Sequence, residues 1–234
     1  MKVISAERIS EAIANLCLQA NLVLRKDVLL ALRKAYVKET NKRARGLLNA
    51  VITNSSIAEK EKLAICQDTG MPVVFLEIGQ DVRIKGDLRS AVNRGINSGY
   101  KKGNFRKSVV SDPVSRGKAG FLPAIIHTEI ARGQNLKIVV MPKGFGCENK
   151  SQLKMFNPTA GLPQIKKFII EAVKSAGPDA CPPYIVGVGI GGTADYAAFL
   201  AKKALLKPLG GKASKLEQEL LKELNNLKIG HNFL

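Results

Sequence analysis

The chain has 234 residues, of which 45% are hydrophobic, and it carries 37 Lys and Arg against 19 Asp and Glu. This length and composition suit a large packed core, in one domain or in two closely joined lobes. No apolar run approaches the roughly 20 residues that span a membrane, and the first residues, MKVISAERIS, lack the apolar segment of a signal peptide. We therefore expect a cytoplasmic protein with no membrane partner.

The formal net charge of +18 would attract anionic partners such as nucleic acids, acidic proteins or small carboxylates. Between Arg25 and Arg45 the chain has eight Lys and Arg against two acids. A nucleic-acid interface usually interleaves aromatic residues with such charges, and only Tyr36 lies in this stretch. The basic residues are therefore interpreted as the solvated face of a helix, and nucleic acid is not expected as a partner.

Apolar periodicity and capping patterns divide the chain into helices and strands. In the N-terminal half we expect helices over residues 6–20 and 27–39, a short helix that opens at a capping box at 56–59, a strand over 72–78 and a helix over 87–102. In the C-terminal half we expect strands over 123–130 and 136–141, a Gly-rich turn over 142–151, a helix around 165–173, a buried strand over 184–192 and a helix opened by Ser214 and Glu217. The predicted class is α+β, with helices packed around a small mixed or antiparallel sheet.

The four cysteines, at positions 17, 66, 147 and 181, are too few and too dispersed for a disulfide scaffold. Cys17 falls on an apolar helix face and is predicted to be a core residue. Cys66 and Cys181 lie at boundaries between apolar and polar segments, and two prolines stiffen the loop after Cys181. A rigid loop thiol suits a metal or cluster ligand, although a partly buried turn cysteine fits the same pattern, and no CxxC spacing is present.

Two further loops have both a functional and a structural interpretation. The glycines around Cys147 could cradle a carboxylate or a cluster with backbone N–H groups, or they could form a tight turn after a strand. Arg106, Lys107, Arg116 and Lys118 could clamp a carboxylate, or they could belong to a mobile basic loop. The glycines of residues 187–192 match a dinucleotide fingerprint, but no acid follows at the required spacing. Close packing of a strand on a helix explains them better.

Four segments, AICQDTGMPVVF, NFRKSVVSDP, PKGFGCENKS and CPPYIVGVGIGGTAD, occur in this order along the chain. With these segments the chain resembles the alpha subunit, or N-terminal catalytic domain, of the iron–sulfur class I fumarases and L-tartrate dehydratases. The resemblance covers nearly the whole chain. Residues 1–234 are therefore expected to form one catalytic domain of this alpha type.

The resemblance implies a [4Fe–4S] cluster held by three cysteines, with a fourth iron that acts as a Lewis acid on the substrate. The implied reaction is the reversible hydration of fumarate to malate, a step of the tricarboxylic acid cycle, carried out with a beta-type partner subunit. The alpha chain is also expected to form a homodimer. Two alternatives stay open: an L-tartrate dehydratase alpha subunit, and a non-catalytic short homologue without a cluster.

The resemblance also implies roles for individual residues. Cys66 and Cys181 match two cluster ligands, and Asp68 matches a substrate contact that relays a proton. The remaining matches are Gln67 as a substrate contact and catalytic residue, Thr69 as a catalytic residue, Arg106 as a carboxylate-binding arginine, and Gly146 as part of the backbone near the substrate.

The sequence departs from the family pattern near its end. The family continues to a third cysteine ligand, whereas this sequence ends KIGHNFL, with His231 in place of the usual proline. We therefore expect the family's C-terminal segment, and with it the third ligand, to be missing. Cys147 stands where the family often has serine, and it is a possible but disfavoured replacement.

Overall fold

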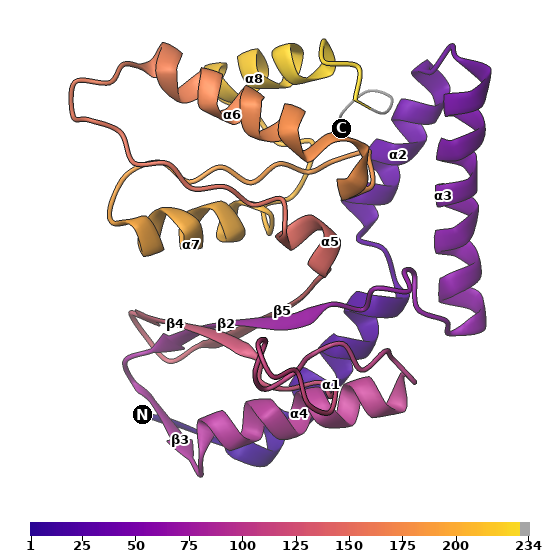
Figure 1. Ribbon diagram of the computed structural model, residues 1–234. Helices are drawn as coiled ribbons and strands as arrows, with labels where there is room; N and C mark the ends of the chain where they lie inside the picture. Colours follow the sequence, from indigo (N-terminus) through magenta and orange to yellow (C-terminus); the bar gives the residue numbers. More distant parts are fainter. Residues whose placement is uncertain (230–234) are drawn as a thin grey trace. The chain divides into compact units, whose positions relative to one another are not determined.

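The computed structural model describes residues 1–229, so His231 lies outside the described residues. The elements divide between two compact units, which are described separately (Figure 1). The first unit comprises residues 1–25 and 53–145, and the second comprises residues 26–52 and the chain from 146 onward. The combination of many helices with two small sheets confirms the predicted α+β class.

The first unit contains both sheets. Its elements are β1 (Lys2–Ser5), α1 (Ala6–Leu22), β2 (Met71–Gly79), β3 (Val82–Lys85), α4 (Leu88–Lys102), β4 (Ile125–Ala131) and β5 (Leu136–Lys143). The central strand β2 pairs in parallel with β4 and antiparallel with β5, so this sheet is mixed, as expected. The strands β1 and β3 form a separate parallel pair.

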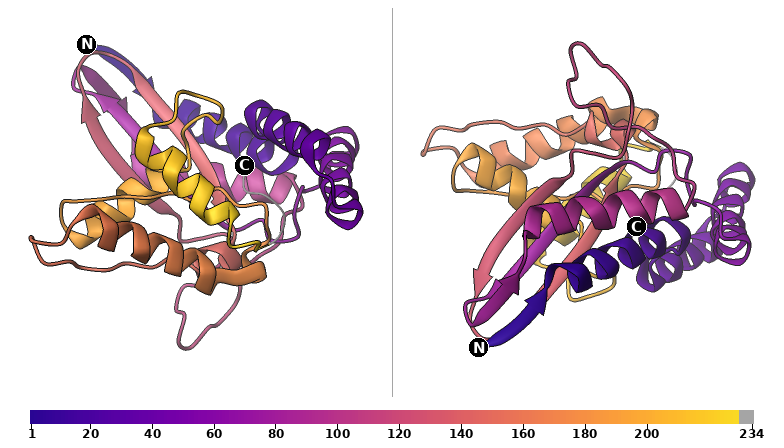
Figure 2. Two further views of the ribbon diagram at one scale, coloured as in Figure 1. Left: turned by 90° about the horizontal axis from the view of Figure 1, so that it is seen from above. Right: turned by 90° about the horizontal axis from the view of Figure 1, so that it is seen from below.

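The helices α1 and α4 pack side by side against one face of the three-stranded sheet, as the view from below shows (Figure 2). Ile13 of α1, Ile96 of α4 and Val74 of β2 are completely buried in the shared core. The two helices approach closely because α4 carries glycines at the contact: a Cβ on Gly99 would lie 2.6 Å from the carbonyl oxygen of Ala14. This core fixes the sheet whose ends carry the candidate site.

The second unit is helical. Its elements are α2 (Lys26–Lys38), α6 (Leu162–Ala176), the 3-10 turn η1 (Gly177–Ala180), α7 (Ala194–Ala204) and α8 (Lys215–Asn225), with the start of α3 (Lys42–Glu61) and most of α5 (Phe145–Glu148). Ser214 and Glu217 form the predicted capping box of α8. Lys166 of α6 pairs with Glu219 and Glu223 of α8, at 2.8 Å and 3.2 Å. No helix of the described chain is long and apolar enough to cross a membrane.

One predicted helix start is wrong, and one predicted cap lies inside its helix. The pattern at 56–59 lies inside α3, which begins at Lys42 because Asn41 accepts from the backbone N–H groups of Arg43 and Ala44 and so caps the helix much earlier. The helix expected over 27–39 is present as α2, and Asp27, which the sequence offers as its capping residue, lies in the first turn, where its carboxylate accepts from the backbone N–H of Leu209. A pattern of four residues cannot tell a cap from a helix interior.

Two C-terminal predictions also need correction. Residues 184–192 are extended but form no strand, because no described segment offers them a hydrogen-bonded neighbour. The segment packs on α7 instead, and a Cβ on Gly189 would lie 2.1 Å from the carbonyl oxygen of Ala197. The expected turn over 142–151 contains one helical turn, α5, after the end of β5.

Candidate functional site

The segment Cys66–Gly70 is a loop that connects the end of α3 to the start of β2. Hydrogen bonds anchor the loop just before Cys66: the backbone N–H of Ile65 donates to the carbonyl of Asn21 (2.9 Å), and the side-chain amide of Asn54 donates to the carbonyl of Ile65 (2.8 Å). Cys66 and Gln67 are exposed at the surface of the first unit. The loop therefore presents a thiol and an amide from a fixed backbone.

Asp68 links this loop to the end of β5. One carboxylate oxygen accepts from the backbone N–H of Gly70 at 3.1 Å, and the other accepts from the backbone N–H of Phe145 at 2.8 Å. Gly144 lies close to the same carboxylate, since a Cβ on Gly144 would be 3.1 Å from the oxygen that accepts from Phe145. Two backbone donors thus orient the Asp68 carboxylate, and each oxygen keeps a further lone pair for another proton donor.

Gly70 is required by its conformation and by its surroundings. Its φ of +69° lies in the left-handed region, and a Cβ at this position would lie 2.6 Å from the carbonyl carbon and oxygen of Lys143. The glycine of the CQDTG motif therefore lets the loop approach the backbone at the end of β5. The Asp68–Phe145 hydrogen bond depends on this approach.

Thr69 is buried, with 3% of its surface exposed, and it joins the loop to the segment that carries Arg106. Its hydroxyl donates to the backbone carbonyl of Arg106 at 3.4 Å, while its own carbonyl accepts from the hydroxyl of Tyr100 at 3.0 Å. Arg106 itself is exposed. Asp68 and Thr69 are thus neighbours in the loop, and Thr69 connects them to the backbone of Arg106 within the first unit. Tyr100, which holds Thr69, was not identified from the sequence, where its only sign was its place on an apolar helix face.

Cys181 lies in the second unit, directly after η1. Its φ of +58° is uncommon for a residue with a side chain, and Pro182 and Pro183 follow it. The thiol is exposed. A backbone held in a left-handed conformation at one exposed cysteine is a feature that clusters at functional positions.

Cys147 lies on α5 in the same unit and contacts the segment before Cys181. Its thiol donates to the carbonyl of Ala180 at 3.3 Å. Lys150 pairs with Asp179 at 3.4 Å and so joins the same two segments, whereas Glu148 pairs with Lys202 and links α5 to α7. Gly146, which begins this stretch, has open space where a Cβ would stand.

Tyr184 packs in the second unit near both thiols, a neighbour that sequence reasoning did not identify. Its hydroxyl donates to the carbonyl of Gly177. Burial raises the pKa of Tyr184 above its ordinary value of 10, and the negative charges that Cys147 and Cys181 would carry raise it further. The hydrogen bond to Gly177 ties Tyr184 to the start of η1, four residues before Cys181.

The donor types fit an iron–sulfur cluster, but the ligand set is incomplete within each unit. Cys66 and Cys181 are exposed loop cysteines, and cysteine thiolates are the usual ligands of such clusters. Within residues 1–229, no three or more His, Cys, Asp or Glu side chains are grouped so that they could hold a metal ion. Cys17 is buried in the core, as predicted, and burial raises the pKa of its thiol to about 12.

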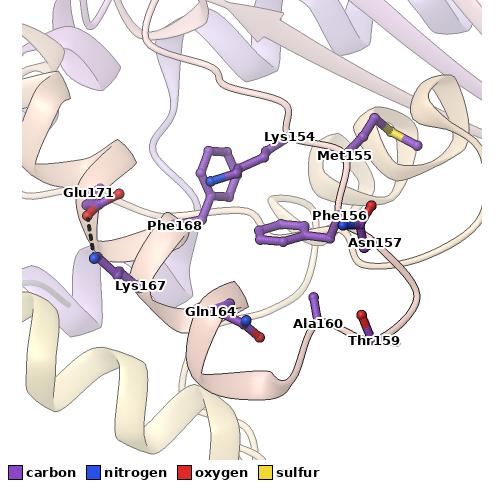
Figure 3. Close-up of a pocket in the computed structure, with 10 residues that line it drawn as sticks. All are labelled: Lys154, Met155, Phe156, Asn157, Thr159, Ala160, Gln164, Lys167, Phe168 and Glu171. Atoms are coloured by element: carbon purple, nitrogen blue, oxygen red, sulfur yellow. Dashed lines mark ion pairs between the residues drawn. The ribbon is translucent and has the colours of Figure 1, made fainter.

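A pocket of about 490 Å³ lies elsewhere in the second unit, and it contains none of the predicted site residues (Figure 3). Lys154 lies over the rings of Phe156 and Phe168, and Lys167 pairs with Glu171 at one side of the pocket. No cysteine or histidine is among the described residues that line it, so the lining supplies no cluster ligand. The candidate residues therefore lie in the CQDTG loop of the first unit and, separately, in the loops of Cys147 and Cys181 in the second unit.

The sequence matches proteins of one family. The sequence profile described as fumarate hydratase (Fumerase) matches residues 10–233. A protein of Methanocaldococcus jannaschii, provisionally named L(+)-tartrate dehydratase subunit alpha, is 38% identical over 95% of this chain and 82% of its own length. The L(+)-tartrate dehydratase subunits alpha of Escherichia coli and Shigella boydii are each 28% identical over 97% of this chain and 78% of their own length.

Proposed function

The chain belongs to the fumarate hydratase family, whose members are hydro-lyases, and we propose that it is the alpha subunit of an enzyme that adds water reversibly to a small unsaturated dicarboxylate. Fumarate and malate are the proposed substrates. The supporting observation is the linked loop in the first unit, where Asp68 is oriented by two backbone donors and Thr69 joins it to the Arg106 segment.

Water addition to a dicarboxylate needs a group that moves a proton at carbon and groups that hold the carboxylates. We propose Asp68 for proton transfer, Gln67 as a hydrogen-bonding substrate contact, and Arg106 as the residue that binds a carboxylate through charge-assisted hydrogen bonds. Thr69 is proposed to position the Arg106 backbone, because its hydroxyl is buried against it. Gly146 is proposed to leave open backbone for the substrate.

We propose Cys66 and Cys181 as two ligands of a [4Fe–4S] cluster. When bound, the cluster would supply a Lewis-acidic iron for the hydroxyl group that leaves or enters. After anaerobic reconstitution we expect about four iron atoms and four sulfide ions per protein chain, as one [4Fe–4S] cluster requires. Serine at position 66 or 181 should lower both counts, whereas Cys17→Ala changes a core residue and should leave them unchanged.

A beta-type partner subunit is proposed because the relatives are named as alpha subunits. We also propose that the alpha chain self-associates, which sedimentation of the purified chain measures directly. We place the reaction in the cytoplasm, since thiolate cluster ligands need a reducing compartment.

The deciding experiment mixes the chain with a beta-type subunit under anaerobic conditions and follows the ultraviolet absorbance of fumarate with malate as the substrate. The same preparation is then given L(+)-tartrate, and its 2-oxo acid product is measured. Turnover of malate, reduced by Asp68→Asn, supports the proposal. Turnover of tartrate alone assigns the second candidate, which the names of the relatives favour, and no turnover of either acid by the cluster-loaded pair favours a non-catalytic homologue.

A further inference from the structure

Two cysteine-bearing segments of the second unit are held side by side. The thiol of Cys147 lies 3.3 Å from the carbonyl oxygen of Ala180, the residue that precedes Cys181. The Lys150–Asp179 ion pair, at 3.4 Å, links the same two segments a second time. These contacts hold the start of the GCENK segment against the DACPP loop.

The contact limits the separation of the two cysteines. A carbonyl oxygen lies about 3 Å from the Cα atom of the next residue, so the Cys147 sulfur lies within roughly 6 Å of the Cys181 Cα atom. The Cys181 sulfur is carried by this Cα atom, so the two side chains are neighbours in the second unit. The bond therefore requires rotation about the Cα–Cβ bonds and whatever approach of the two segments brings their Cα atoms into the range of about 4.4–6.8 Å that a disulfide needs.

Both thiols are also accessible to a reagent in solution, since Cys147 and Cys181 are exposed. Cys17 differs, because it is completely buried. Cys66 is exposed but belongs to the first unit, so it serves as a comparison thiol of similar accessibility.

We propose that Cys147 and Cys181 form a reversible disulfide when the protein meets a low-molecular-weight disulfide such as oxidised glutathione. One thiolate attacks the small disulfide and releases one glutathione thiolate, which leaves a mixed disulfide on the protein. The second thiolate attacks the protein sulfur of this mixed disulfide and releases the second glutathione. Two protein thiols are oxidised, one glutathione disulfide is reduced to two thiols, and the two protons pass to the released thiolates.

The disulfide has a consequence that rests on the proposed function. Cys181 is the proposed cluster ligand of the second unit, and a sulfur held in a disulfide cannot bind iron as a thiolate. Oxidised chain should therefore take up no cluster until a thiol reductant has restored Cys181. Formation of the bond itself does not depend on any activity, so it is tested on the purified chain alone.

The test treats the full chain with oxidised glutathione, blocks the remaining thiols and digests the protein with trypsin without reduction. Cleavage after Lys and Arg gives distinct peptides for Cys147 (residues 144–150), Cys181 (residues 175–202) and Cys66 (residues 63–83). The expected product is the linked pair 144–150 with 175–202, which a reductant separates. Cys66→Ser should leave the linked pair unchanged, while Cys147→Ser should abolish it and leave a glutathione adduct on Cys181.

Two results would overturn the proposal. One is a linked pair that contains the Cys66 peptide in place of the Cys147 peptide. The other is an oxidised protein in which Cys147 and Cys181 each carry glutathione and no linked peptide forms. Circular dichroism of each serine variant verifies that it is folded, so a missing disulfide is not mistaken for a missing fold.

Discussion

The carboxylate of Asp68 accepts a hydrogen bond of 2.8 Å from the backbone N–H of Phe145, a residue 77 positions farther along the chain. Its other oxygen accepts from Gly70, so this one side chain joins the CQDTG loop to the end of β5. Asp68 thus has a structural role beside its proposed part in proton transfer. One variant, Asp68→Asn, tests the two roles through two separate measurements, turnover and the free energy of unfolding.

Asp68→Asn should lower the turnover of the reconstituted enzyme by about 10²-fold or more, because an amide cannot relay a proton as a carboxylate does. The free energy of unfolding should fall by about 1–2 kcal/mol, because the amide nitrogen cannot accept one of the two backbone N–H groups. Asp81→Asn, at an exposed turn, is the control and should change neither value. Full turnover by Asp68→Asn would remove this residue from proton transfer.

Tyr100→Phe should destabilise the chain by about 1 kcal/mol, since the carbonyl of Thr69 loses its buried donor. Burial, above all, raises the pKa of Tyr100 above its ordinary value of 10, so the hydroxyl stays a donor at neutral pH. Urea unfolding measures the effect. Tyr196→Phe removes a hydroxyl from a half-exposed ring and should leave the urea midpoint unchanged; equal losses in both variants would contradict the assigned hydrogen bond.

Gly99→Ala tests the close packing of α4 on α1. The new Cβ would lie 2.6 Å from the Ala14 carbonyl oxygen and 2.8 Å from the Cys17 Cβ, so we expect a loss of about 1–3 kcal/mol despite the better helix propensity of alanine. Gly46→Ala in α3 is the matched control, because nothing lies within 4 Å of its new Cβ. The control should gain about 0.5–1 kcal/mol from propensity alone. A stabilised Gly99→Ala variant would contradict the observed helix contact.

Asp87 should make the stability of the first unit depend on pH in the acid range. The side chain of Ser90, and then its backbone N–H, hold the pKa of Asp87 below its ordinary value of 3.8. The stabilisation is therefore complete above pH 3.8 and is lost as the pH falls through the lower value in the folded state. Asp87→Asn keeps the cap without the charge, so the difference in urea midpoint between wild type and this variant should narrow on acidification; a constant difference would show that the charge plays no part.

The sequence predicted those features that depend on neighbours a few residues apart. The helices at 6–20 and 87–102 follow from apolar periodicity, and the capping box at Ser214 and Glu217 follows from local hydrogen bonding. The four motifs were sufficient to recognise the family. The same local reasoning failed at Ser56, because an earlier cap at Asn41 had already begun the helix.

Only the tertiary structure decided which distant residues meet. The link from Asp68 to Phe145, the support of Thr69 by Tyr100, and the contact of Cys147 with Ala180 join segments that are 77, 31 and 33 residues apart. The apolar run at 184–192 has strand composition, but a strand needs a hydrogen-bonded neighbour, and glycines at 187 and 189 fit it to α7 instead. Propensities act over a few residues, whereas these contacts depend on how the whole chain packs.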